Sequence, residues 1–107
     1  MAIDTCVLEQ KDYIVGMRRY FHAHPEVSLK EFMTSVRIEE ELDKVGIEHT
    51  RVGETGVYAR VVGKKTVEGK TKIVALRADM DALGMDDLKN CDYSSQNPGF
   101  CHACGHD

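Results

Sequence analysis

The chain has 107 residues, of which 42% are apolar and 30% are charged, and its formal net charge is −4. This length allows one domain with a small core, and this composition excludes the disordered, collagen-like and membrane classes of protein. Its lysines and arginines are scattered along the sequence rather than gathered in one basic stripe, so we expect no nucleic-acid partner.

The first ten residues carry Asp4 and Glu9 and lack a basic segment followed by an apolar one. We therefore expect no secretory signal. The longest apolar stretches are far shorter than the roughly 20 residues that cross a bilayer, so we expect no membrane partner and a cytoplasmic location. In that compartment the four cysteines are expected to be reduced thiols or metal ligands rather than disulfides.

Two helices are predicted in the first half of the chain. Apolar residues recur at helical spacing from Thr5 to His22, ahead of Pro25. A second helix is predicted from Leu29 to Val45, with Ser28 and Glu31 as a capping box and Gly46 as its left-handed end. Its buried stripe should consist of Leu29, Phe32, Met33, Val36, Leu42 and Val45.

The pattern then changes to strands. Residues 47–52 and 57–62 are predicted strands around the turn at residues 53–56, and residues 63–72 suit an exposed connection. The unbroken apolar run at residues 73–76 is typical of a central strand covered on both faces, and residues 82–107 read as loop. The sequence therefore predicts an α/β fold with two helices followed by at least three strands.

Asp79 and Asp81 follow this central strand, at the edge where open α/β sheets bind ligands. They could be ligands of a metal, or orient its histidine ligands, and they could equally form a solvated exit from the strand. For His22 and His24, just before Pro25, a role in ending the helix is favoured over metal binding.

The chain ends in the sequence CHACGHD, which concentrates metal-ligand residue types. A thioredoxin-like pair of Cys101 and Cys104 would need a preceding strand and a helix start, but the residues before it form a loop. Gly105 interrupts a c-type haem motif, the last residues do not suit prenylation, and a zinc knuckle lacks its second paired motif. Cys104 and His106 remain as an incomplete metal site that needs further ligands.

Three segments in order, RRYFHAHPEVSLKEFMTSVRIEEEL, VALRADMDAL and NPGFCHACGHD, carry a family resemblance over residues 18–107. The chain resembles the N-terminal third of the metal-dependent amidohydrolases that include hippurate hydrolases, N-acyl-amino-acid amidohydrolases and auxin-conjugate hydrolases, within the aminoacylase and carboxypeptidase superfamily. The resemblance implies that residues 1–107 are a partial catalytic domain of metallopeptidase-like fold. The lid or dimerisation domain would then lie outside this chain.

The resemblance also implies a site. Cys104 and His106 match two ligands of a two-metal centre that holds zinc, manganese or nickel, and Asp81 matches an aspartate that orients a metal-bound histidine. Asp79 stands where distant relatives have a histidine ligand, and direct ligation by it is not expected. The chain departs from the family at Gly84, where proline is usual, and at Cys101, where methionine is usual, which makes the Cys-x-x-Cys spacing incidental.

The implied reaction is hydrolysis of the amide bond of small N-acyl amino acids or conjugates by metal-activated water. The general-base glutamate of the family has no match here, so the 107 residues alone are expected to be inactive. An exposed edge of the central strand would favour a homo-oligomer. Two other hypotheses are a small metal-binding or interaction module without catalysis, and a thiol redox protein that uses Cys101 and Cys104.

Overall fold

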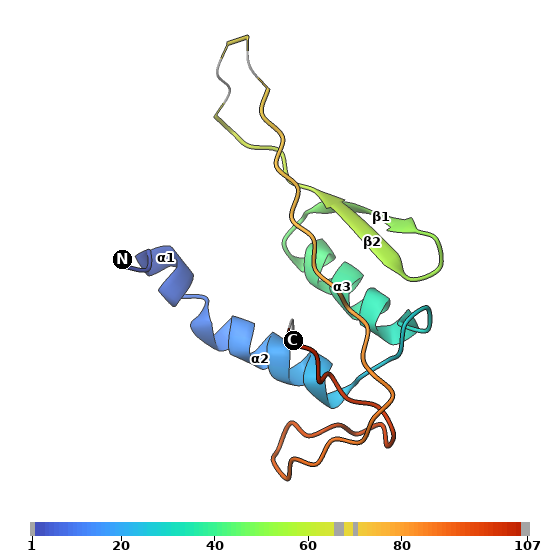
Figure 1. The fold of residues 1–107 in the computed structure, drawn as a ribbon. Helices are drawn as coiled ribbons and strands as arrows, with labels where there is room; N and C mark the ends of the chain where they lie inside the picture. The colour runs from blue at the N-terminus through green and yellow to red at the C-terminus, as the bar shows by residue number, and fades with distance from the viewer. Residues whose placement is uncertain (1, 66–67, 70, 106–107) are drawn as a thin grey trace.

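The computed structural model describes residues 2–65, 68–69 and 71–105. Along the chain these form α1 (Thr5–Leu8), α2 (Lys11–Ala23), α3 (Phe32–Lys44), β1 (Glu48–Val52) and β2 (Gly56–Arg60), as Figure 1 shows. The α/β class is confirmed. The expected counts of helices and strands are both wrong for the described residues, which form three helices and two strands. No described helix has the length and apolarity needed to cross a bilayer.

The single helix predicted for residues 5–22 is divided into α1 and α2. The Asp4 carboxylate accepts a hydrogen bond from the backbone N–H of Cys6 at 3.0 Å and so caps α1. Gln10 then donates its backbone N–H to the Val7 carbonyl three residues back, at 3.1 Å. This tighter turn interrupts the α-helical hydrogen bonding, which resumes in α2.

The end of α2 is where the sequence predicted it. The helix stops at Ala23, and His24 occupies the C-cap position. The His24 Nδ1–H donates to the Tyr20 carbonyl at 2.7 Å, and the two rings stack with their centroids 4.4 Å apart. The role of His24 in ending the helix is therefore confirmed.

The start of α3 differs from the predicted capping box. Glu31 is the N-cap residue, but its side chain makes no capping hydrogen bond. The carboxylate of Glu26 instead accepts the backbone N–H groups of Met33 and Thr34, at 3.1 and 2.5 Å, and the Thr34 hydroxyl at 2.6 Å. The capping prediction is wrong because a carboxylate earlier in the chain already takes the free donors of the first turn.

The other end of α3 confirms its predicted glycine stop. Gly46 has a φ of +70°, and its N–H donates to the Asp43 carbonyl at 3.1 Å. The N–H of Ile47 reaches the Leu42 carbonyl at 3.0 Å. These two bonds form a Schellman motif, which needs a residue in the left-handed region at this position.

The strands β1 and β2 form an antiparallel hairpin in which Thr50 pairs with Tyr58, so both strand predictions here are confirmed. The hairpin lies against α3, as Figure 1 shows. The Arg51 guanidinium donates to the Glu39 carboxylate at 2.9 and 2.5 Å, and the Ser35 hydroxyl donates to the Thr55 carbonyl. Polar contacts therefore join the helix to the sheet.

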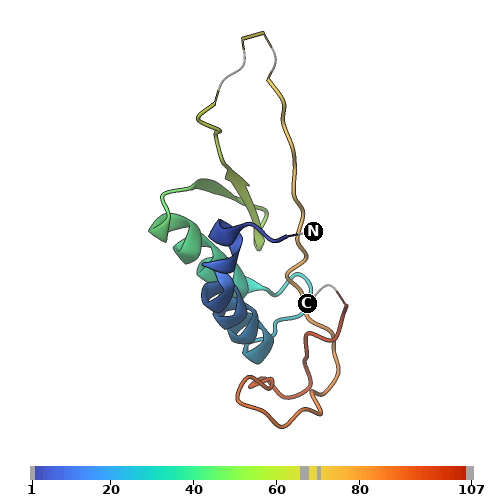
Figure 2. The ribbon, with the colours of Figure 1, turned by 90° about the vertical axis from the view of Figure 1, so that its left-hand side faces the viewer.

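The predicted central strand at residues 73–76 is wrong for the described part of the chain. This segment pairs with no described strand, and Ile73, Val74 and Leu76 are 90%, 83% and 96% exposed. Figure 2 shows it in an extended stretch that stands apart from the hairpin and leads toward the C-terminal loop. An apolar run becomes a central strand only when other strands flank it, and within the described ranges β2 pairs with β1 and no other strand.

The prediction that an apolar stripe of α3 is buried is also wrong, because most of the residues in this stripe are exposed. The most deeply buried side chains are His22, Pro25 and Ser35, so the interior is largely polar. The radius of gyration is 16.4 Å, whereas about 13 Å is typical of a compact domain of this length. The described structure is therefore open, and its best-packed region lies at the end of α2. The exposed members of the stripe are Leu29, Phe32, Met33, Val36 and Val45.

Candidate metal centre

The end of α2 is joined to the C-terminal loop through backbone groups. The N–H of Ala82 donates to the Glu26 carbonyl at 2.7 Å, and Val27 and Ala82 form a parallel bridge. The side-chain amide of Asn97 donates to the Pro25 carbonyl at 3.1 Å. Segments more than 50 residues apart in the sequence thus meet at this helix end.

A second bridge joins the segment of Asp81 to the segment of Cys104. Leu83 and Cys101 exchange antiparallel N–H···O bonds of 2.9 and 3.0 Å. Because the segments run in opposite directions, residues before Leu83 and residues after Cys101 extend to the same side of the bridge. Asp81 is half-buried there, Cys104 is an exposed free thiol, and His106 lies outside the described residues.

Asp79 forms an ion pair with a residue close to it in the sequence. Its carboxylate lies 2.9 Å from the guanidinium of Arg77, and the Arg77 and Asp79 side chains are 90% and 40% exposed. A surface ion pair of this kind holds little free energy. The expectation that Asp79 is not a direct metal ligand stays a prediction.

Asp87 is the most strongly perturbed carboxylate at this end of the molecule. Its buried oxygens accept the backbone N–H groups of Ser95 and Lys89, at 2.9 and 3.1 Å. His22 Nε2 lies 3.2 Å from Oδ2, and the ammonium of Lys89 lies 3.7 Å from Oδ1. The backbone donors, followed by the Lys89 charge and the His22 contact, lower the pKa of Asp87 to about 2, so a buried anion is held here.

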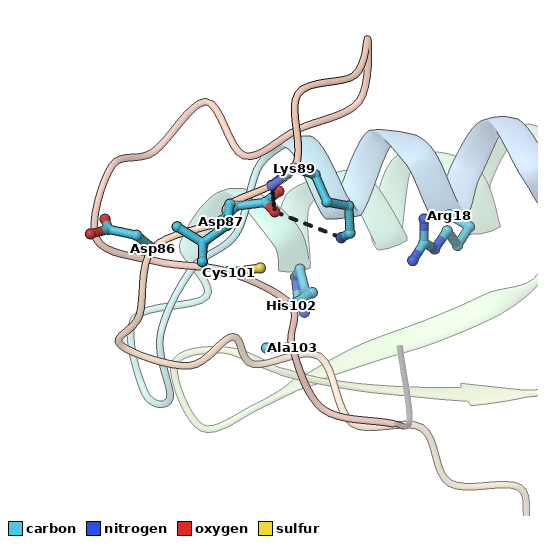
Figure 3. Close-up of a pocket in the computed structure, with 8 residues that line it drawn as sticks. Arg18, Asp86, Asp87, Lys89, Cys101, His102 and Ala103 are labelled. Carbon is cyan, nitrogen blue, oxygen red and sulfur yellow. Dashed lines mark hydrogen bonds and ion pairs between the residues drawn. The ribbon is translucent and has the colours of Figure 1, made fainter.

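A pocket of about 470 Å³ opens beside this carboxylate, and Arg18, Lys89, Cys101 and His102 line it together with Asp86, Asp87, Leu88 and Ala103. Figure 3 shows the Lys89 ammonium reaching toward Asp87, with His102 below and Arg18 to one side. Lys89 Nζ also lies 2.8 Å from His22 Nε2. The pocket is therefore a mixed-charge site in which an imidazole, a carboxylate and a cation meet.

Tyr93, in the C-terminal loop, packs against residues of α2. Its ring lies edge-on to the His22 ring, with 5.9 Å between centroids. The Arg19 guanidinium lies 4.9 Å from the Tyr93 centroid and that of Arg18 lies 5.5 Å away. These contacts fix the loop against the helix by cation–π attraction.

The described residues bring one set of three metal-ligating side chains together: His22, Asp87 and Cys101, whose ligand atoms all lie within 4.8 Å of one another. The sequence pattern favours a helix-ending role for His22, indicates no role for Asp87 and makes the cysteine at position 101 incidental. The first two residues are 65 positions apart. Local spacing therefore carries no signal for this set, and only the folding of the loop onto α2 reveals it.

The chain is similar in sequence to several known hydrolases, although no family model matches it. An N-acyl-L-amino acid amidohydrolase of Geobacillus stearothermophilus is 41% identical over 106 residues, which are 98% of this chain and 28% of that protein. A thermostable carboxypeptidase 2 of Saccharolobus solfataricus is 45% identical over 102 residues, 94% of this chain and 25% of that protein.

A solved structure agrees with these relatives. The Bacillus subtilis YXEP protein, a dinuclear metal binding peptidase of the M20 family, superposes with a TM-score of 0.79 at 36% identity, over 89% of this chain and 26% of that one. The chain belongs to the M20 amidohydrolase family. It spans about a quarter of the length of the relatives it matches.

Proposed function

We propose that this M20 chain forms part of the catalytic domain of a cytoplasmic, metal-dependent hydrolase that cleaves the amide bond of N-acyl amino acids or amino-acid conjugates. The observation that carries the proposal is the 41% identity to an N-acyl-L-amino acid amidohydrolase over nearly the whole chain. The substrate is a small molecule, hippurate being the simplest to assay. The proposal includes a homo-oligomer and no nucleic-acid or membrane partner.

Cys104 and His106 would hold the metal. Cys104 is exposed, and the position of Gly105 beside it has open space around it, so an ion can reach the thiol. A thiolate and an imidazole suit zinc, and we propose a centre of two divalent ions, with manganese and nickel as alternatives to zinc. When bound, these ions would supply an activated water and polarise the substrate carbonyl.

Asp81 would act on this centre through a histidine. A carboxylate that accepts the free ring N–H of a metal-bound histidine fixes its tautomer and its orientation. The bridge between Leu83 and Cys101 supports this role, because it extends the Asp81 and Cys104 segments to the same side. The proposal assigns no general base to the 107 residues.

The test compares Cys104→Ala with Cys6→Ala in the complete protein that carries this segment. Cys6 is also an exposed thiol, but it lies in α1, away from the proposed centre. We expect Cys104→Ala to lose bound metal and hydrolysis of hippurate, by about 100-fold or more, while Cys6→Ala retains both. Metal content by elemental analysis and glycine release are the two measurements.

Full metal content and full activity in Cys104→Ala would contradict the assignment of this ligand. Turnover by the 107-residue chain alone, at the rate of a complete relative, would contradict the absence of a base from these residues. Activity that survives complete removal of metal would contradict the proposed reaction.

A further inference from the structure

Among the described residues, a cluster of metal-ligating side chains that does not include Cys104 lies beside the pocket at the end of α2. One ring nitrogen of His22, one carboxylate oxygen of Asp87 and the Sγ of Cys101 lie within 4.8 Å of one another. We propose that these three side chains bind one divalent ion of the zinc type, separately from the centre proposed at Cys104 and His106.

The three ligands come from the end of α2 and from two parts of the C-terminal loop that the fold holds together. His22 ends α2 and is fully buried. Cys101 is buried in the bridge with Leu83, and Asp87 is fixed by the backbone N–H groups of Ser95 and Lys89. The backbone around each ligand is therefore positioned before any ion arrives, which lowers the entropic cost of binding.

The spacing suits a tetrahedral ion. Zinc bonds of about 2.0–2.3 Å place neighbouring ligand atoms roughly 3.3–3.8 Å apart. His22 Nε2 and Asp87 Oδ2 already lie 3.2 Å apart, and the 4.8 Å limit for the three ligand atoms exceeds the tetrahedral spacing by about 1 Å. Rotation of a cysteine side chain about χ1 covers such a distance.

The ligand types and their charges also suit zinc. Imidazole, thiolate and carboxylate are the usual zinc ligands in proteins. On binding, the Cys101 thiol releases its proton to solvent, so one thiolate and one carboxylate balance the two charges of the ion.

Lys89 shows that this place accepts a cation. Its ammonium lies 2.8 Å from His22 Nε2 and 3.7 Å from Asp87 Oδ1. The side chain is half-exposed on a long flexible stem, so it can swing into solvent when an ion replaces it. Lys89 is therefore an internal competitor for the ion, and the open pocket leaves room for a water as the fourth ligand.

The test uses Co²⁺, since a thiolate bound to cobalt gives a near-ultraviolet charge-transfer absorption and identifies the sulfur. The reduced full chain is titrated with Co²⁺ and then with competing Zn²⁺, in the wild type and in Cys101→Ser, Cys104→Ser and Cys6→Ser. We expect Cys101→Ser to lose one thiolate-bound equivalent, with affinity at that site reduced about 10- to 100-fold. We expect Cys104→Ser and Cys6→Ser to retain that equivalent.

Lys89→Met supplies a gain of affinity that misfolding could not produce. Removal of the competing ammonium should raise the affinity of this site for Co²⁺ by about 10-fold. The loss of one competing charge contact changes an affinity by about this factor. Three results would overturn the proposal: no thiolate absorption in the wild type, full absorption in Cys101→Ser, or unchanged affinity in Lys89→Met. In Cys104→Ser, we expect the metal bound at Cys104 to be lost and the equivalent bound at Cys101 to remain. This variant therefore tests the proposed function separately from the present proposal.

Discussion

Glu26 stabilises a helix to which it does not belong. Its carboxylate accepts the N–H groups of Met33 and Thr34, which are the second and third residues of α3. An N-cap side chain normally accepts these same donors. The negative charge also lies at the positive end of the α3 dipole, so Glu26 takes both roles of a capping residue from outside the helix.

Replacing this carboxylate should destabilise the chain. We expect Glu26→Ala to lower the free energy of unfolding by about 1–2 kcal/mol, because two backbone donors and the Thr34 hydroxyl lose their acceptor. Urea unfolding followed by circular dichroism measures the loss. Glu40→Ala is the matched control. Glu40 lies exposed on α3, the helix that Glu26 caps, and its replacement should change stability by less than about 0.5 kcal/mol. Equal effects of the two substitutions would show that Glu26 is not a cap.

Asp87 resembles Glu26 in that its carboxylate also accepts two backbone N–H groups. Its oxygens accept two backbone N–H groups from the loop and contact His22 in α2. The acidic shift in its pKa follows chiefly from those backbone donors. One buried carboxylate thus joins the loop to the helix and keeps a negative charge in the pocket wall.

At the scale of elements, a glycine inside a helix and a glycine just past a helix end have opposite effects on stability. Gly46 closes the Schellman motif at φ +70°, where a side chain is strained. Gly16 lies inside α2, where a glycine weakens the helix and an added Cβ would meet nothing within 4 Å. The same substitution should therefore change stability in opposite directions at the two sites.

We expect Gly46→Ala to lower the free energy of unfolding by about 1 kcal/mol and Gly16→Ala to raise it by roughly 0.5–1 kcal/mol. Each variant is the control for the other, because both add one methyl group, one inside α2 and one just past the end of α3. The measurement is the midpoint of urea unfolding at a constant slope. A stabilising effect of Gly46→Ala would mean that the left-handed end of α3 does not form in solution.

At the scale of the whole molecule, the structure leaves much apolar surface uncovered. The radius of gyration of 16.4 Å exceeds the value of about 13 Å for a compact domain of this length. Extended backbone at residues 73–76 carries apolar side chains that are more than four-fifths exposed. Such a segment can pair with the same segment of another copy through unpaired backbone groups.

We therefore expect the isolated chain to self-associate, with a sedimentation coefficient that rises with concentration. Val74→Lys should reduce this association, since a lysine on an exposed strand edge opposes edge-to-edge pairing. Leu88→Lys puts the same charge on another exposed apolar residue, outside this segment, and should leave the association unchanged. A wild-type chain that stays monomeric at all concentrations would contradict the prediction.

The sequence by itself determined the features that depend on neighbouring residues. The glycine end of α3, the helix end at His24 and the two strands around a glycine turn all follow from local backbone preferences, and the structure confirms them. The family also follows from the sequence, because its motifs are contiguous. The roles of Cys104, His106 and Asp81 remain predictions that rest on the same motifs.

Only the tertiary structure decided which residues meet. Glu26 replaced the predicted capping box, the apolar run at residues 73–76 found no partner strand among the described residues, and His22 came to lie beside Asp87 and Cys101. Each of these outcomes depends on groups far apart in the chain. Periodicity and spacing describe what a segment can bury or bind, but the partner that it finds is fixed by packing between segments.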